Sequence, residues 1–167
     1  MKNRTVKWLV FALAFAVGIY IGGGIYETIV IQPVWTASAE VARNWNENPL
    51  FVIQNAWFFI PATNLATLLA LLTLIFGWKS PPPVRFWLRL GTIILLVMYV
   101  FTLAYFIPEQ LALRGHEATK NLSDAEILTR AGRWGTLNYI RVIVALPAVF
   151  AILKALSLSA ILEDKNK

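Results

Sequence analysis

Long apolar runs separated by short polar segments dominate the pattern of this sequence. Residues 8–26, 48–78 and 90–108 contain no charged side chain, and residues 134–153 contain only Arg141. A helix needs about 20 mainly apolar residues to cross the hydrocarbon core of a bilayer, so each run is long enough to span it. The pattern therefore predicts an all-α integral membrane protein, a transmembrane four-helix bundle that forms a single domain over residues 1–167.

Prolines and a capping signal set the expected ends of these helices. Pro33 and Pro108 should end the first and third helices, because proline lacks the amide N–H and its ring clashes inside a helix. Ser123 and Glu126 have the capping-box spacing that opens a helix. The first run lacks a small-residue cleavage pattern, so we expect a retained helix rather than a signal peptide. The predicted helices cover about residues 6–32, 51–77, 84–107 and 124–160.

Lysine and arginine are distributed unequally between the two ends of the predicted bundle. Nine lie in the N-terminal segment, the second connection and the C-terminal segment, against five in the first and third connections. Because basic residues favour the cytoplasmic side, we predict cytoplasmic termini in a bacterial inner membrane. This placement accounts for the net charge of +6 without nucleic acid as a partner. Tryptophans that should anchor the helices at the membrane interfaces are Trp35, Trp45, Trp78 and Trp87.

The sequence offers few metal ligands. It has no cysteine and one histidine, His116, which excludes disulfides, cysteine-ligated clusters and zinc sites of the usual Cys/His type. Haem held by two histidines of one protomer is excluded as well. We therefore predict no metal site and no cofactor, and we expect His116 to be solvated in the third connection.

Two charges fall inside the predicted helices, Glu27 in the first and Arg141 in the fourth. A charge in hydrocarbon is costly unless it faces the bundle interior and finds a partner. At 1.5 Å per residue, both lie roughly 8–10 Å below the outer ends of their helices. An ion pair between them is therefore predicted, and it would either lock the two helices together or belong to a functional site.

Other polar and aromatic side chains are expected near this depth. Polar groups that converge under apolar walls are typical of a small-molecule site, although amides in membrane helices also serve as contacts between helices. Glycines at positions 18 and 22–24 favour close approach of another helix to the first. The candidate site residues besides the two charges are Trp134, Asn138, Asn55, Tyr105 and Phe59.

The stretch from Trp134 to Arg141 resembles a known signature. It reads W-x-x-x-N-x-x-R with Asn138 in the middle, and an Asn-Pro-Leu segment at residues 48–50 fits the same family. In these features the chain is similar to the anthrone-oxygenase-like membrane proteins of bacteria and fungi. The resemblance implies oxidation of anthrones to anthraquinones by molecular oxygen without a metal or organic cofactor. Tyr139 stands where many relatives have a histidine, so a mechanism that requires an imidazole there does not transfer.

Three functional hypotheses remain open. In the first, an enzyme oxidises a lipophilic aromatic ketone, with Glu27 as the base and Arg141 and Asn138 stabilising the enolate oxygen. A carboxylate paired with Arg141 would be a weaker base, which is the difficulty of this hypothesis. In the second, the cluster only orients a hydrophobic small molecule or lipid for binding or transport, and transport would favour a homo-oligomer. In the third, the chain is a structural partner among membrane lipids.

Overall fold

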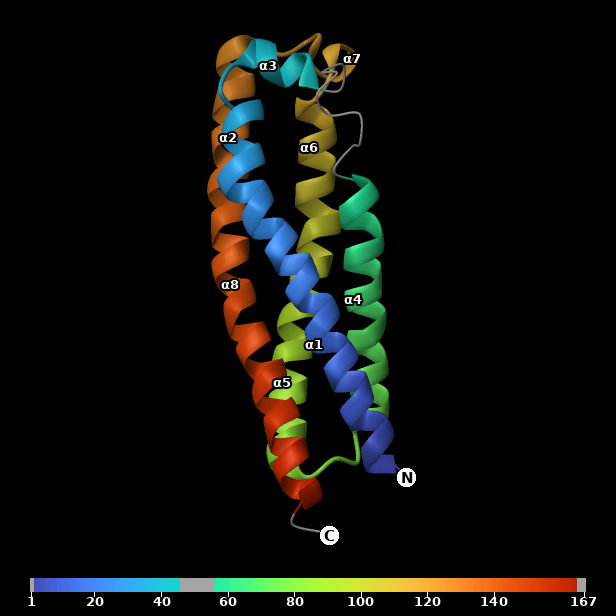
Figure 1. Ribbon diagram of the computed structural model, residues 1–167. Helices are drawn as coiled ribbons and strands as arrows, with labels where there is room; N and C mark the ends of the chain where they lie inside the picture. The colour runs from blue at the N-terminus through green and yellow to red at the C-terminus, as the bar shows by residue number, and fades with distance from the viewer. Residues whose placement is uncertain (1, 46–55, 165–167) are drawn as a thin grey trace.

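The computed structural model describes residues 2–45 and 56–164, and all elements in these ranges are helical. Four helical rods within them are long and apolar enough to cross a membrane, and they stand side by side (Figure 1). The rods are α1 (Lys2–Tyr26) with η1 (Glu27–Ile31) and α2 (Gln32–Trp35); α4 (Ala56–Gly77); α5 (Pro82–Phe101) with η4 (Thr102–Phe106) and α6 (Ile107–Leu113); and α8 (Asp124–Asp164). The predicted all-α membrane bundle is confirmed.

The rods form a ring in which each long helix has two neighbours. Helix α1 packs against α4 and α8, and α5 packs against the same two helices. The start of α1 and the end of α8 lie at the same end of the bundle (Figure 1). Apolar side chains fill the interior, as at Leu13 and Leu88, and also cover the outside, as at Phe15 and Ile75. Helices that are apolar on both faces are suited to a lipid environment.

Two π-helical segments carry the first and third rods past prolines that were expected to end them. In η1 the backbone N–H of Gln32 donates a hydrogen bond to the carbonyl of Glu27, and in η4 the backbone N–H of Ile107 donates one to the carbonyl of Thr102. These wider turns directly precede Pro33 and Pro108, and they shift the carbonyls that the proline rings would otherwise meet. The prediction that these prolines end the helices is therefore wrong.

Two short helices cover the end of the bundle opposite the termini (Figure 1). Helix α3 (Ala39–Arg43) belongs to the first connection and α7 (His116–Thr119) to the third. Arg43 joins the two connections, since it bonds to Asp124 at 2.6 Å and to the carbonyl of Leu122 at 3.0 Å. Glu109 of α6 makes two 2.7 Å hydrogen bonds with Arg130 of α8. We call this end of the bundle the cap.

Several smaller expectations are settled in the same region. The capping box is confirmed, because Ser123 and Glu126 exchange hydrogen bonds at the start of α8. His116 is exposed, as expected. Trp35 and Trp45 do not lie at an interface with lipid; both are buried in a second apolar core beneath the cap.

Glycines bring some helices close together, but not as the sequence suggested. Of the predicted glycines, Gly23 alone faces another helix closely, where the ring of Phe58 occupies the position of a side chain. Nothing lies within 4 Å of such a position at Gly18, Gly22 or Gly24. Gly91 of α5 packs against backbone, since an added Cβ would lie 3.1 Å from the carbonyl oxygen of Ala148 in α8.

Candidate functional site

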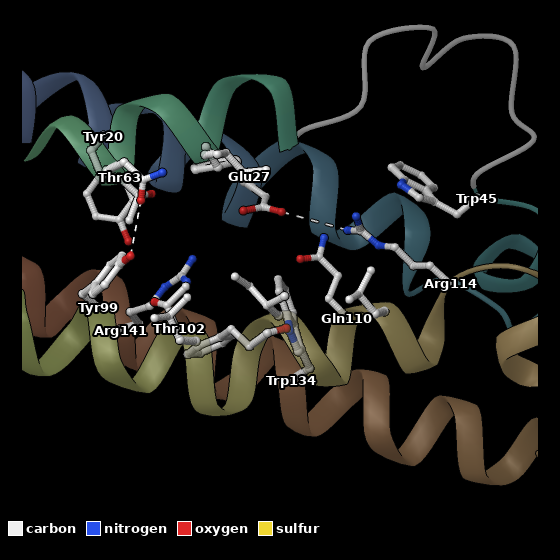
Figure 2. A pocket seen from close by; sticks show the side chains of 17 residues that line it. Tyr20, Glu27, Trp45, Thr63, Tyr99, Thr102, Gln110, Arg114, Trp134 and Arg141 are labelled. Atoms are coloured by element: carbon white, nitrogen blue, oxygen red, sulfur yellow. Dashed lines mark hydrogen bonds and ion pairs between the residues drawn. The ribbon is translucent and has the colours of Figure 1, made fainter. Parts of the chain in front are cut away.

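A cavity of about 540 Å³ lies among the four rods toward the cap (Figure 2). Its volume is within the roughly 300–1,000 Å³ of known small-molecule sites. Both π segments contribute to its wall, through Glu27 of η1 and through Thr102, Leu103 and Phe106 of η4. The polar side chains of the wall are Tyr20, Glu27, Thr63, Asn64, Tyr99, Thr102, Gln110, Arg114 and Arg141, and its aromatic residues include Phe59, Phe106 and Trp134.

The carboxylate of Glu27 is paired with Arg114 and not with Arg141. Its Oε1 lies 4.0 Å from Nη2 of Arg114, and the two side chains are 6% and 9% exposed. Figure 2 shows this pair across the cap-side end of the cavity. Because the third rod continues past Pro108, it carries Arg114 back toward the first rod at the level of Glu27. The predicted pair between Glu27 and Arg141 is therefore wrong.

Arg114 is held in a cage of aromatic and amide groups. Its guanidinium carbon lies 4.5 Å from the ring centroid of Trp35 and 5.3 Å from that of Trp45. Gln110, with its amide turned to satisfy both groups, accepts hydrogen bonds from both Nη atoms, one of them 2.8 Å long. Burial lowers the pKa of Arg114 to about 10 and Glu27 opposes this, so the guanidinium is charged at neutral pH.

Arg141 reaches the same cavity from α8, and no described residue neutralises its charge there. Its guanidinium carbon lies 4.3 Å from the ring centroid of Phe106. Over residues 4–45 and 57–161, whose side chains the structure describes, no carboxylate forms an ion pair with it and no acceptor hydrogen-bonds to it. Figure 2 shows the guanidinium beside Thr102, away from the pair of Glu27 and Arg114. A membrane-spanning helix thus presents an uncompensated positive charge to a cavity, which is costly unless a ligand uses it.

Asn138 faces the first rod and does not line the cavity. It is fully buried, and its Nδ2 donates to Thr28 Oγ1 at 2.9 Å and to Gln32 Oε1 at 3.1 Å. Gly135 leaves space for the Gln32 side chain, since an added Cβ there would collide with the Gln32 amide nitrogen. This placement links η1 and α2 to α8, and it does not put the Asn138 amide beside Arg141 in an oxyanion site.

The other predicted residues divide between the cavity and its surroundings. Trp134 and Phe59 line the cavity, and the Trp134 Nε1 donates to the carbonyl of Phe106 at 3.2 Å. Tyr105 does not line it; its ring stacks on Phe101 with centroids 5.5 Å apart. Asn55 lies outside the described residues.

The comparison with known families decides how the chain is classified. A family described as anthrone oxygenase matches residues 51–151, more than half of the sequence. This chain belongs to the anthrone oxygenase family. The matched region includes Trp134, Asn138 and Arg141, while Glu27 lies before it. A search of curated proteins and a search of solved structures find no match.

In this anthrone oxygenase family member, several lining residues form one stripe on the third rod, and most of them were not among the predicted site residues. They recur every three or four positions along α5, η4 and α6, which is the spacing of one helical face. The expected end at Pro108 concealed this stripe, because Gln110 and Arg114 were assigned to a connection. Its members that line the cavity are Tyr99, Thr102, Phe106, Gln110 and Arg114.

Proposed function

We propose that this member of the anthrone oxygenase family binds a flat, lipophilic aromatic ketone in the cavity and promotes its oxidation by molecular oxygen through an enolate. The observation that carries the proposal is the charge of the site. Glu27 and Arg114 neutralise each other, whereas Arg141 adds a positive charge without a counter-ion among the described residues. A ligand that becomes an anion in the cavity would supply the missing negative charge.

The reaction balances without a further reductant. Loss of one proton from the methylene carbon of an anthrone leaves an enolate whose charge is spread over the rings and the carbonyl oxygen. The enolate carbon gives electrons to oxygen and forms a C–O bond, and the peroxide takes up the proton held by the base. Loss of the second proton from the same carbon then forms the new C=O bond and breaks the O–O bond, and the hydroxide released takes up this proton and leaves as water. One anthrone and one O₂ thus yield one anthraquinone and one water.

The chain's residues fit separate roles in this sequence. Glu27 is the candidate proton acceptor, because it is the carboxylate among the described residues that line the cavity. Arg141 is the candidate donor to the enolate oxygen. Phe59, Phe106 and Trp134 supply flat apolar contacts to the rings. A guanidinium still neighbours the base in this arrangement, because Arg114 takes the place expected for Arg141, and its positive charge weakens Glu27 as a proton acceptor.

An anaerobic mixing experiment tests this function. The protein is purified in detergent and mixed with emodin anthrone, and quinone absorbance and oxygen uptake are followed after air is admitted. Glu27→Gln and Arg141→Gln should each slow quinone formation by about 10²–10³-fold, the usual effect of removing one transition-state donor. Arg133→Gln is the matched control, because Arg133 is exposed on the same helix and does not line the cavity. Oxygen uptake no faster than in empty micelles would instead favour a binding or transport module for a hydrophobic molecule.

The direction of insertion is part of the proposal. From the bias of basic residues, we propose cytoplasmic termini in a bacterial inner membrane, which turns the cap and the cavity toward the outer face. The chain has no cysteine, so a single introduced cysteine reports accessibility cleanly. Glu117→Cys, at an exposed position in the cap, should react with a membrane-impermeant thiol reagent added to intact cells. Protection of this cysteine until the cells are lysed would reverse the orientation.

A further inference from the structure

We propose that the ligand enters the cavity sideways from the bilayer, as a neutral planar molecule, through a mouth between α4 and the segment η4–α6. This inference rests on the proposed function, because it takes the aromatic ketone as the ligand. It adds the route by which the ligand enters and the charge state in which it enters. The uncharged form is admitted, and the anion is formed only inside, beside Arg141.

The mouth is defined by residues that line the cavity and also face outward. One is Asn64 of α4, an amide at the edge of the cavity, and the others are the aliphatic residues Ile60 of α4, Leu103 of η4, and Ile107 and Leu111 of α6. The exposed fractions of the four aliphatic side chains run from 40% at Ile107 to 68% at Leu111. All four lie in rods that are long and apolar enough to span a membrane. The surface at this opening is therefore mostly aliphatic and meets lipid chains, and its exposed lining residues carry no charge over the part of the chain that the structure describes.

The remaining walls are closed. Tyr20, Glu27, Phe106 and Trp134 line the cavity and are between 1% and 8% exposed. At the cap-side end stand Trp45 and the caged Arg114, which are also buried against the second apolar core. In the part of the chain that the structure describes, the exposed side chains of the wall thus gather on the side of the mouth, whereas the cap side is packed.

The packing of α4 explains why the opening lies at this level. Helix α4 rests on α1 and α5, while α6 rests on α8. At the edge of the cavity the Tyr99 hydroxyl donates to Asn64 Oδ1 at 3.3 Å, which joins α5 to α4. Beyond this link toward the cap, Pro61 lies inside α4 and removes one helical hydrogen bond, which permits local bending.

Blocking the mouth with a removable label tests the route. The chain has no cysteine, so Ile107→Cys and Leu111→Cys each take a bulky reagent through a mixed disulfide. The control is Ile75→Cys, which faces outward on α4 but does not line the cavity. The protein is placed in nanodiscs and mixed with vesicles that contain 1,8-dihydroxyanthraquinone. This achiral molecule gains a circular-dichroism signal only when it is held in a chiral site, so the signal reports loading.

The label at either mouth position should slow loading by at least about tenfold, and dithiothreitol should restore the original rate. The label at Ile75→Cys should have no effect on the rate. Anthraquinone-2-sulfonate added in water should load far more slowly than the lipid-dissolved quinone, because its charge cannot cross the aliphatic mouth.

Loading at the unlabelled rate in both labelled mouth variants would overturn the proposal, and so would fast loading of the sulfonate. Absence of a dichroism signal from every protein would contradict ligand binding itself. If the label slows loading but the wild-type protein takes up no oxygen with emodin anthrone, the proposed entry route would stand and the proposed oxygenase activity would be wrong. The failures of the two proposals are thus distinguishable.

Discussion

The Glu27 carboxylate and the Arg114 guanidinium lie 4.0 Å apart, so the end of the third rod neutralises the charge of the first. The pair closes the cap side of the cavity, because Trp35 and Trp45 flank the guanidinium. It also leaves Arg141 as the charge available to a ligand. The position of one arginine after α6 therefore determines both the shape of the cavity and its net charge.

Replacing Arg114 should destabilise the fold strongly. Arg114→Gln leaves the buried Glu27 carboxylate without its guanidinium partner, and breaking a buried ion pair in this way costs about 3–5 kcal/mol. Thermal denaturation of the detergent-purified protein measures the loss. The double variant with Glu27→Gln should recover much of the stability, because the side chain buried at position 27 is then neutral.

The matched control for that prediction is an exposed ion pair. Lys120→Gln removes the partner of Glu117, which lies at 2.9 Å but on the surface. Exposed pairs contribute little, so its melting temperature should stay near that of the wild type. An equal fall in melting temperature for Arg114→Gln and Lys120→Gln would show that the pair of Glu27 and Arg114 stabilises the fold no more than an exposed pair does.

The contact between α5 and α8 should depend on Gly91. In Gly91→Ala the added Cβ would lie 2.9 Å from a side-chain carbon of Ile152 and 3.1 Å from the Ala148 carbonyl oxygen. The backbone of Ala148 cannot move aside as a flexible side chain can, so α5 and α8 must separate. This separation should lower the free energy of unfolding by about 1–3 kcal/mol. Gly18→Ala is the control, because nothing lies within 4 Å of its added Cβ. A melting temperature equal in the two variants would contradict the tight packing at Gly91.

The membrane fold was predictable because its signal is long and local. Apolar runs such as residues 134–153 exceed the length of a span, and the capping box at Ser123 needs only neighbouring residues. Candidate residues on single helical faces were also recovered in part. Trp134 and Arg141 are seven positions apart, two helical turns, and both reach the cavity.

The pairing of the charges was not predictable in the same way. Depth along a helix places Glu27 and Arg141 at similar levels, but it does not say which rods adjoin at that level. The π segments before Pro33 and Pro108 extend two rods beyond their expected ends, and single-sequence rules read both prolines as breaks. Asn138 shows the same limit, since its place between Trp134 and Arg141 does not reveal that it faces Thr28.

Asn138 should act mainly by positioning α8 against the first rod. Asn138→Ala removes two buried hydrogen bonds, to Thr28 and Gln32, and should cost about 1–3 kcal/mol of stability. The effect on the rate of anthrone oxidation should be smaller than that of Arg141→Gln. Asn64→Ala serves as the stability control, because Asn64 is exposed and makes a longer bond of 3.3 Å. A folded Asn138→Ala protein with wild-type stability and no oxidation would instead place this amide at the enolate oxygen.

Arg141 should show opposite effects on stability and activity. Within the described residues its guanidinium has no ion pair or hydrogen bond, so Arg141→Gln removes a costly charge from a membrane-spanning helix and loses only the cation–π contact with Phe106. The gain in stability should be at most about 3 kcal/mol, the scale for one charge at the centre of a span. Oxidation should nevertheless fall by about 10²–10³-fold, since the enolate loses its cationic donor. Thermal denaturation and oxygen uptake, measured on the same preparation, test both effects. A loss of stability together with activity would mean that Arg141 holds the bundle together, and the positive charge would then no longer support an anion site.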